Sequence, residues 1–212
     1  MKKQQQGFTL VEIALVLVVI GLILGGLLKG QALIDNARAR SMATQIDNIS
    51  AAWYGFIDRY RALPGDFETA DTRIEAAMGT GDGNGRINTA TEAAQVWQHL
   101  SASGFVAGNF DGDGAAGELG DTACANSTCP QNPYGGFMKI SSSDGGNGPL
   151  QLITGENVPS RVLMQLDLKL DDGNADSGRF RVFADTANSC ANGADWVVDE
   201  TGSSCSGVWL GL

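Results

Sequence analysis

The sequence predicts an α+β fold: a long N-terminal α-helix packed on a small antiparallel β-sheet head that carries additional short helices. The long helix is predicted because residues 8–60 contain no proline, the residue that most strongly stops a helix. The head is predicted from its glycine content, since the chain has 29 glycines in 212 residues, about twice the average usage. These glycines stand with Asp, Asn and Ser between short apolar segments, which is typical of strands joined by turns.

The first part of the long helix, residues 8–28, is apolar apart from Glu12. Its 21 residues match the roughly 20 that cross a bilayer. A carboxylate costs about 2.5–3.5 kcal/mol at the centre of a membrane. Glu12 therefore has to be explained by a function rather than by the stability of the helix in lipid.

The second part, residues 29–62, is amphipathic. Its apolar residues are spaced by four, three, four, three and four positions, which places them on one helical face: Met42, Ile46, Ile49, Trp53, Phe56 and Tyr60. At 1.5 Å per residue the whole helix would be about 80 Å long. It should end near Leu63-Pro64-Gly65-Asp66, because Pro64 disfavours a helical Leu63 and Pro-Gly marks a turn.

The head, residues 63–212, contains signals for two further helices and several strands. Thr89 and Glu92 have the spacing of a capping box, and Gly104 is a C-terminal stop. Pro159 favours a helix start, so Val158–Leu170 is interpreted as a helix although its leucines also alternate as in a strand. Strands are expected at Phe137–Ile140, Leu150–Ile153, Phe180–Phe183, Trp196–Val198 and Val208–Leu210.

The start of the chain resembles the precursors of type IV pilins and the pseudopilins of type II secretion systems. The resemblance lies in Gly7-Phe8-Thr9-Leu10-Val11-Glu12 ahead of a long apolar helix. It implies a leader of residues 1–7, cleavage between Gly7 and Phe8 by prepilin peptidase, and methylation of the new Phe8 amine. A secretory signal peptide and a plain membrane anchor are alternatives; the 21-residue run exceeds the 7–15 residues of a signal core.

The resemblance also implies a pilin-like fold and a function without enzymatic activity. The chain would be a structural subunit of a type IV pilus-like filament, with other pilin subunits as partners. It would span the inner membrane once and then join a periplasmic or cell-surface filament. Glu12 would neutralise the Phe8 amine of the next subunit and set its axial register; a contact with the Phe8 amine of the same chain is the alternative. A type II secretion pseudopilin and a minor tip subunit with a binding role are the alternatives.

Lys29 stands where many type IV pilins carry a proline. The sequence instead has glycines nearby, at positions 21, 25, 26 and 30, each of which weakens a helix by about 1 kcal/mol relative to alanine. Two interpretations remain open. The helix melts locally at Gly25-Gly26 on assembly, or the small residues allow helices to pack closely.

The four cysteines form two local pairs, Cys124 with Cys129 and Cys190 with Cys205. An even number of cysteines in an exported chain indicates disulfides. The pairing Cys124–Cys129 and Cys190–Cys205 is the simplest of three connectivities, and the second pair resembles the C-terminal disulfide loop of many pilins. Zinc is a weaker alternative, because the spacing of the second pair does not suit it and His99 lies far away in sequence.

Glycine-rich acidic loops raise the question of calcium, which prefers carboxylate and carbonyl oxygens. Three loops of this kind are candidates: residues 82–86, residues 111–114 and residues 172–176. Asp172, Asn174 and Asp176 match the first three ligand positions of an EF-hand, but Phe183 stands where a bidentate Glu would be needed. The alternative is that Asp-Gly and Asn-Gly simply make turns.

Charge and motifs argue against two classes of function. Removing residues 1–7 leaves 12 Lys and Arg against 24 Asp and Glu, a formal charge of −12, which repels phosphate backbones and disfavours nucleic-acid binding. The single histidine, His99, has no catalytic partner that the sequence identifies, and hydrolase and phosphate-loop motifs are lacking. A hydrolase built on a carboxylate pair is the remaining enzymatic alternative.

Overall fold

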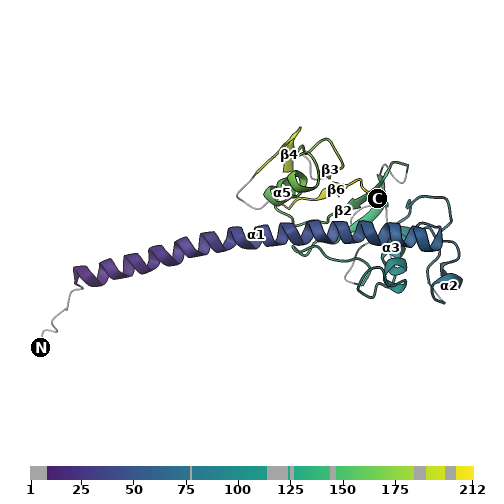
Figure 1. The fold of residues 1–212 in the computed structure, drawn as a ribbon, viewed down its shortest axis with the longest axis horizontal. Helices are drawn as coiled ribbons and strands as arrows, with labels where there is room; N and C mark the ends of the chain where they lie inside the picture. The colour runs from purple at the N-terminus through teal and green to yellow at the C-terminus, as the bar shows by residue number, and fades with distance from the viewer. Residues whose placement is uncertain are drawn as a thin grey trace, which may run out of the picture. The chain divides into compact units, whose positions relative to one another are not determined.

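The computed structural model describes residues 9–76, 78–113, 124, 127–143, 147–183, 190–198 and 204–212. Its contacts divide the chain into two compact units, Met1–Arg38 and Ala39–Leu212. The second unit begins inside the long helix, so the part of that helix from Ala39 onward belongs to the head by packing, whereas residues 29–38 of its amphipathic part do not. Within this unit, α2 (Ala70–Arg73), α3 (Ala90–Ala102) and the β-sheet gather around the helix (Figure 1).

The long helix, α1, spans Leu10–Tyr60. It ends a few residues before the expected Leu63-Pro64 stop, because Arg61 adopts a left-handed conformation with φ 57°. The Arg61 N–H donates to the carbonyl of Ile57 at 2.8 Å, which closes the last turn. A non-glycine residue in this conformation is unusual at a helix end, and the sequence does not predict it.

The predicted apolar face of α1 is confirmed. All six of its residues are buried, and Trp53 and Phe56 are among the largest side chains that the head encloses completely. Phe56 lies at the centre of an aromatic group, with its ring centroid 4.6 Å from that of Tyr60 and 6.1 Å from that of Phe67. The core of the head is therefore built directly on the helix.

Four antiparallel strands form the main sheet, in the order β1-β2-β6-β3. They are β1 Lys139–Ser142, β2 Leu150–Ile153, β6 Gly207–Trp209 and β3 Phe180–Val182. The C-terminal strand β6 thus lies between β2 and β3, pairing Trp209 with both Leu152 and Phe180. A separate hairpin joins β4 Ala191–Asn192 to β5 Asp195–Trp196.

Three short helices complete the described part of the head: α2 Ala70–Arg73, α3 Ala90–Ala102 and α5 Ser160–Leu170. The predicted capping box is confirmed at α3, where the Glu92 N–H donates to the Thr89 hydroxyl and the Thr89 N–H to the Glu92 carboxylate. Gly104 follows in the left-handed region at φ 82°. The helical interpretation of Val158–Leu170 is confirmed, starting after Pro159.

Several strand boundaries differ from those expected. The strand expected at Phe137–Ile140 forms at Lys139–Ser142, and the one expected at Trp196–Val198 forms at Asp195–Trp196. The helix α2 and the strand β4 were not predicted. A two-residue strand or a single helical turn has no periodicity to recognise, and its ends depend on which residues find a partner across the sheet.

Candidate functional site

The N-terminal turn of α1 is organised around Thr9 and Glu12. The Glu12 Oε2 atom accepts two hydrogen bonds from Thr9, one from its backbone N–H and one from its hydroxyl, both at 2.8 Å. In return the Glu12 N–H donates to the Thr9 hydroxyl at 3.3 Å. This reciprocal pattern is a capping box. It holds the carboxylate beside the helix N-terminus, where negative charge is favoured.

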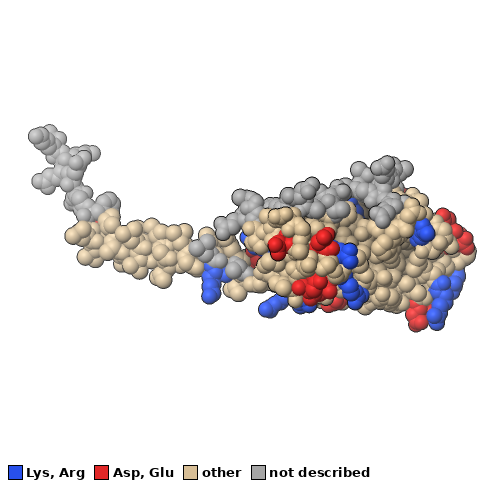
Figure 2. Space-filling model, turned by 90° about the horizontal axis from the view of Figure 1, so that it is seen from above, with Lys and Arg blue, Asp and Glu red and all other residues tan. Residues whose placement is uncertain are grey.

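The helix that follows presents its apolar side chains to the outside. The large apolar side chains described between Leu10 and Ile34 have exposed fractions from 45% at Val19 to 91% at Leu10. On the face seen in Figure 2, the first part of α1 shows no charged side chain. By length and composition α1 could cross a membrane, and none of its most apolar stretch is buried. Such a surface needs lipid or other subunits to cover it.

A comparison with protein families decides what this N-terminus is. The family model described as the prokaryotic N-terminal methylation motif matches residues 2–28. The chain carries a prepilin-type N-terminus. The resemblance to type IV pilins and pseudopilins is therefore confirmed over this segment, and the α+β architecture agrees with a pilin-like fold. No curated protein and no solved structure matches the chain.

The prepilin-type motif includes residues that lie outside those described. Gly7 and Phe8, the expected cleavage and methylation positions, precede the first described residue, Thr9. Glu12 is described, and it lies four residues after Phe8 on the exposed start of α1.

The glycines of the prepilin-type helix are all helical in this structure. A Cβ added at Gly21, Gly25, Gly26 or Gly30 would meet no atom within 4 Å. Packing within the described part of the chain therefore does not require glycine at these positions. The two interpretations left by the sequence, local melting and close packing against other helices, both concern the assembled state.

The predicted calcium loop has a different carboxylate arrangement from the one expected. Asp172 lies within 4.8 Å of Asp167 and Asp171 in one group of acidic oxygens, and Asp176 is not part of that group. The loop's side-chain oxygens already accept hydrogen bonds: Asp172 from the Asn174 N–H at 2.9 Å, and Asn174 from the Asp176 N–H at 3.0 Å. Calcium would have to replace part of this network, and its binding stays a prediction.

Asp167 is the buried member of this acidic group, and no pattern in the sequence predicts its role. Its carboxylate accepts from the Trp196 indole N–H at 2.8 Å and from the Gly173 N–H at 3.2 Å. Burial raises the pKa of Asp167 above its ordinary value, and these hydrogen bonds oppose the rise, while the charges of Asp172 and Asp171 add to it. The residue joins α5 to the β4–β5 hairpin.

A second residue whose role the sequence does not predict is Asp66, in the turn after α1. Its carboxylate accepts three backbone N–H groups, from Gly83 at 2.7 Å, Asn84 at 3.1 Å and Gly85 at 2.6 Å. Burial raises the pKa of Asp66, whereas these amide hydrogen bonds lower it. Asp66 therefore holds the glycine-rich loop of residues 82–86 in place. The motif Pro64-Gly65-Asp66 predicted a turn but not this distant partner.

His99 is completely buried, and both ring nitrogens are used. Nδ1 accepts from the Gly65 N–H at 2.9 Å, so Nε2 carries the hydrogen and donates to the carbonyl of Gly79 at 2.8 Å. Burial lowers the pKa of His99. The histidine is thus a neutral structural bridge between two turns.

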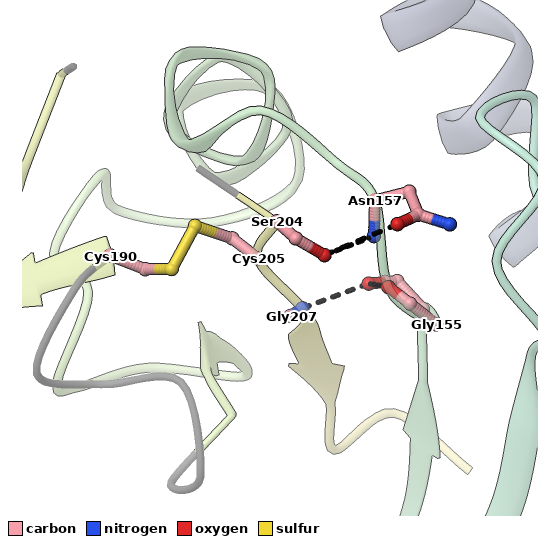
Figure 3. The surroundings of a disulfide bond; sticks show 7 residues. Gly155, Asn157, Cys190, Ser204, Cys205 and Gly207 are labelled. Carbon is pink, nitrogen blue, oxygen red and sulfur yellow. Dashed lines mark hydrogen bonds between the residues drawn. A yellow bond between two sulfur atoms is a disulfide. The ribbon is translucent and has the colours of Figure 1, made fainter. Parts of the chain in front are cut away.

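Both expected cysteine pairs are bonded, Cys124 to Cys129 and Cys190 to Cys205. Figure 3 shows the second, which fixes the start of β4 to the segment that leads into β6. That segment is also held by Ser204, whose hydroxyl accepts from the Asn157 N–H at 2.9 Å. The C-terminal strand and the hairpin are therefore tied to one another covalently.

Proposed function

We propose that this chain is the precursor of a structural subunit of a type IV pilus-like filament. The observation that carries the proposal is the prepilin-type motif at residues 2–28, joined to a helix whose apolar side chains are exposed from Leu10 onward. A helix of this kind has two environments that bury it without water: the inner membrane before assembly and the filament core afterwards. The head of residues 39–212 would remain outside the core.

Processing is the first step of this proposal. Prepilin peptidase would cleave after Gly7, removing Lys2 and Lys3 together with the leader, and the Phe8 amine would be methylated. We expect the mass of the intact exported protein to equal that of residues 8–212 with one added methyl group and two disulfides. A mature start between residues 31 and 40 would instead indicate an ordinary signal peptide.

Glu12 is the residue to which we assign subunit register. In the described residues its hydrogen bonds use Oε2 alone, so Oε1 is available to a cation. After cleavage the nearest new cation is an amine at the start of an apolar helix, either its own or that of the incoming subunit. Burying either charge alone in such an apolar setting costs much more free energy than burying the two charges as a pair. A pair between subunits would fix their axial offset.

Two substitutions separate the charge of Glu12 from its capping role. Glu12→Gln keeps an oxygen that can accept from the Thr9 N–H but removes the charge. Thr9→Val keeps the charge but removes the hydroxyl from the capping box. We expect Glu12→Gln to insert into the membrane normally and to be strongly depleted from sheared filaments. Immunoblotting measures the amount of the subunit in the filaments relative to its amount in the membrane fraction. Thr9→Val should be depleted less.

The outcomes of this comparison differ clearly. Wild-type amounts of Glu12→Gln in filaments would contradict the register role. Loss of both variants from the membrane fraction would assign the Thr9–Glu12 pair to insertion or helix stability instead.

The same motif serves pseudopilins, so a pseudopilus of a type II secretion system is the principal alternative, and a minor tip subunit is another. Deleting the chain's gene would distinguish them. Loss of surface filaments supports a pilus subunit, whereas retained filaments with periplasmic accumulation of secreted proteins support a pseudopilin. Filaments that persist but no longer bind their surface support a tip subunit.

A further inference from the structure

The head contains three Asn-Gly bonds, at Asn84-Gly85, Asn147-Gly148 and Asn192-Gly193. In such a bond the glycine nitrogen can attack the carbon of the asparagine side-chain amide, because glycine has no Cβ to hinder closure of the ring. The new N–C bond forms a succinimide as the C–N bond of the side chain breaks and ammonia leaves. Water then opens the ring to aspartate or isoaspartate. In the structure, hydrogen bonds restrain two of these Asn-Gly bonds and leave the third unrestrained.

Asn192-Gly193 lies at the tip of the β4–β5 hairpin. Both residues are exposed, and a Cβ added at Gly193 would meet nothing within 4 Å. Gly193 has φ 61° and takes the first central position of a two-residue turn, where glycine is preferred. Within the described part of the chain, neither the Asn192 side chain nor the Gly193 N–H has a hydrogen-bond partner. The attacking nitrogen and the amide are therefore unrestrained.

Asn84-Gly85 is restrained on both reacting groups. The Gly85 N–H, whose nitrogen would have to attack, donates to the Asp66 carboxylate at 2.6 Å. The Asn84 side-chain amide donates to Asp82 at 2.8 Å. Attack requires the glycine nitrogen to lose its proton, and a carboxylate bonded to that N–H opposes the loss. It also fixes the orientation of the nitrogen.

Asn147-Gly148 is restrained in a similar way. The Gly148 N–H donates to the carbonyl of Ser143 at 2.8 Å, and the Asn147 side-chain oxygen accepts from Arg86 at 2.9 Å. The neutral carbonyl of Ser143 restrains Gly148 without the added charge that Asp66 brings to Gly85.

We propose that Asn192 is a site of spontaneous modification to aspartate and isoaspartate, and that the Asp66 carboxylate protects Asn84 from the same reaction. Asn192 pairs directly with Asp195 across the hairpin. Aspartate at position 192 sets two carboxylates opposite each other, which disfavours the pair. Isoaspartate adds a carbon to the main chain within the two-residue turn. Modification therefore loosens the hairpin and makes the head more acidic as the protein ages.

The test follows all three bonds in the full-length chain, purified in detergent and incubated at mildly alkaline pH. Peptide mapping by mass spectrometry gives the rate of aspartate and isoaspartate formation at each bond. We expect Asn192 to react several-fold faster than Asn84 and Asn147 in the folded protein. In denaturant the three rates should converge. Equal rates at Asn84 and Asn192 in the folded protein, or the same order of rates in denaturant, would overturn the proposal.

Two variants test the assigned causes. Asp66→Ala should accelerate Asn84 several-fold and leave the rate at Asn192 unchanged. Near-ultraviolet circular dichroism is the control for folding, because Asn147 is bonded to Arg86 of the loop that Asp66 holds and its rate can change with that loop. Gly193→Ala should suppress the reaction at Asn192 only. An Asp66→Ala protein that remains folded and shows the wild-type rate at Asn84 would refute the protective role.

Discussion

At the scale of single residues, the buried polar groups of the head act through backbone partners that are remote in sequence. His99 joins Gly65 to Gly79, and Asp66 binds three amides of the loop of residues 82–86. Each group satisfies backbone atoms that turns would otherwise leave without hydrogen bonds. A sequence shows which side chains can do this but not which backbone atoms will approach them.

The buried His99 should make the head less stable in mild acid. Its folded-state pKa is lowered from an ordinary value near 6.5, so the unfolded chain takes up a proton that the folded chain does not. Above about pH 6.5 the protonation of His99 therefore does not change the free energy of unfolding. Below it, the free energy of unfolding falls as the pH drops toward the folded-state pKa, by at most about 1.4 kcal/mol per pH unit. Denaturant unfolding, followed by tryptophan fluorescence between pH 7 and pH 5, measures this change.

His99 is the only histidine in the chain, which makes a control straightforward. His99→Gln should be less stable at every pH, because it loses one of the two bridging hydrogen bonds, but its stability should no longer fall across this interval. A wild-type protein with constant stability from pH 7 to pH 5 would contradict the neutral, buried histidine.

At the scale of elements, the β4–β5 hairpin is held by few but varied interactions. The Cys190–Cys205 disulfide anchors its start, and Trp196 donates to the buried Asp167 of α5. Closing a loop of about 15 residues contributes roughly 3 kcal/mol in the chain-entropy treatment. A hairpin whose strands have two residues each could not persist without such anchors. Because Trp196 is bonded to Asp167 in the acidic group, its fluorescence should report on the acidic loop.

Calcium binding to the acidic loop is the prediction at this scale. If calcium binds the native head alone, millimolar calcium should raise the melting temperature of the full-length protein in detergent relative to chelator. The free energy of unfolding would rise by about 2.7 kcal/mol at a calcium concentration 100 times the dissociation constant. Asp172→Asn should abolish the shift, whereas Asp111→Asn, in another acidic loop, should keep it. An unchanged wild-type melting temperature would count against calcium.

At the scale of the whole molecule, the chain combines a helix that exposes apolar side chains with a head that buries them. The division falls at Arg38 and Ala39 rather than at the end of α1. The helix is thus shared by two units with different requirements: its first part needs an apolar environment, and its second part is already covered by the head.

This division predicts the behaviour of truncated chains. A fragment starting at Ala39 should be soluble, monomeric and folded, because it keeps Trp53 and Phe56 in the core. A fragment starting at Leu63 should not fold, since it lacks that entire face of the core. Size-exclusion chromatography and near-ultraviolet circular dichroism compare the two. A folded fragment from Leu63 would show that the helix is dispensable to the head.

The sequence by itself determined the features that depend on local chemistry and periodicity. The long helix, its buried face from Met42 to Tyr60, the capping box at Thr89 and the helix after Pro159 follow from spacing and residue type. The prepilin-type N-terminus is likewise a pattern of adjacent residues. The tertiary structure decided what depends on residues meeting across the chain. It placed β6 between β2 and β3 and gave Asp66, His99 and Asp167 their hydrogen-bond partners. It also placed Asp167 and Asp171 beside Asp172, where the sequence predicted Asp176. Such contacts form between segments whose separation in sequence carries no periodic signal, so only the folded chain reveals them.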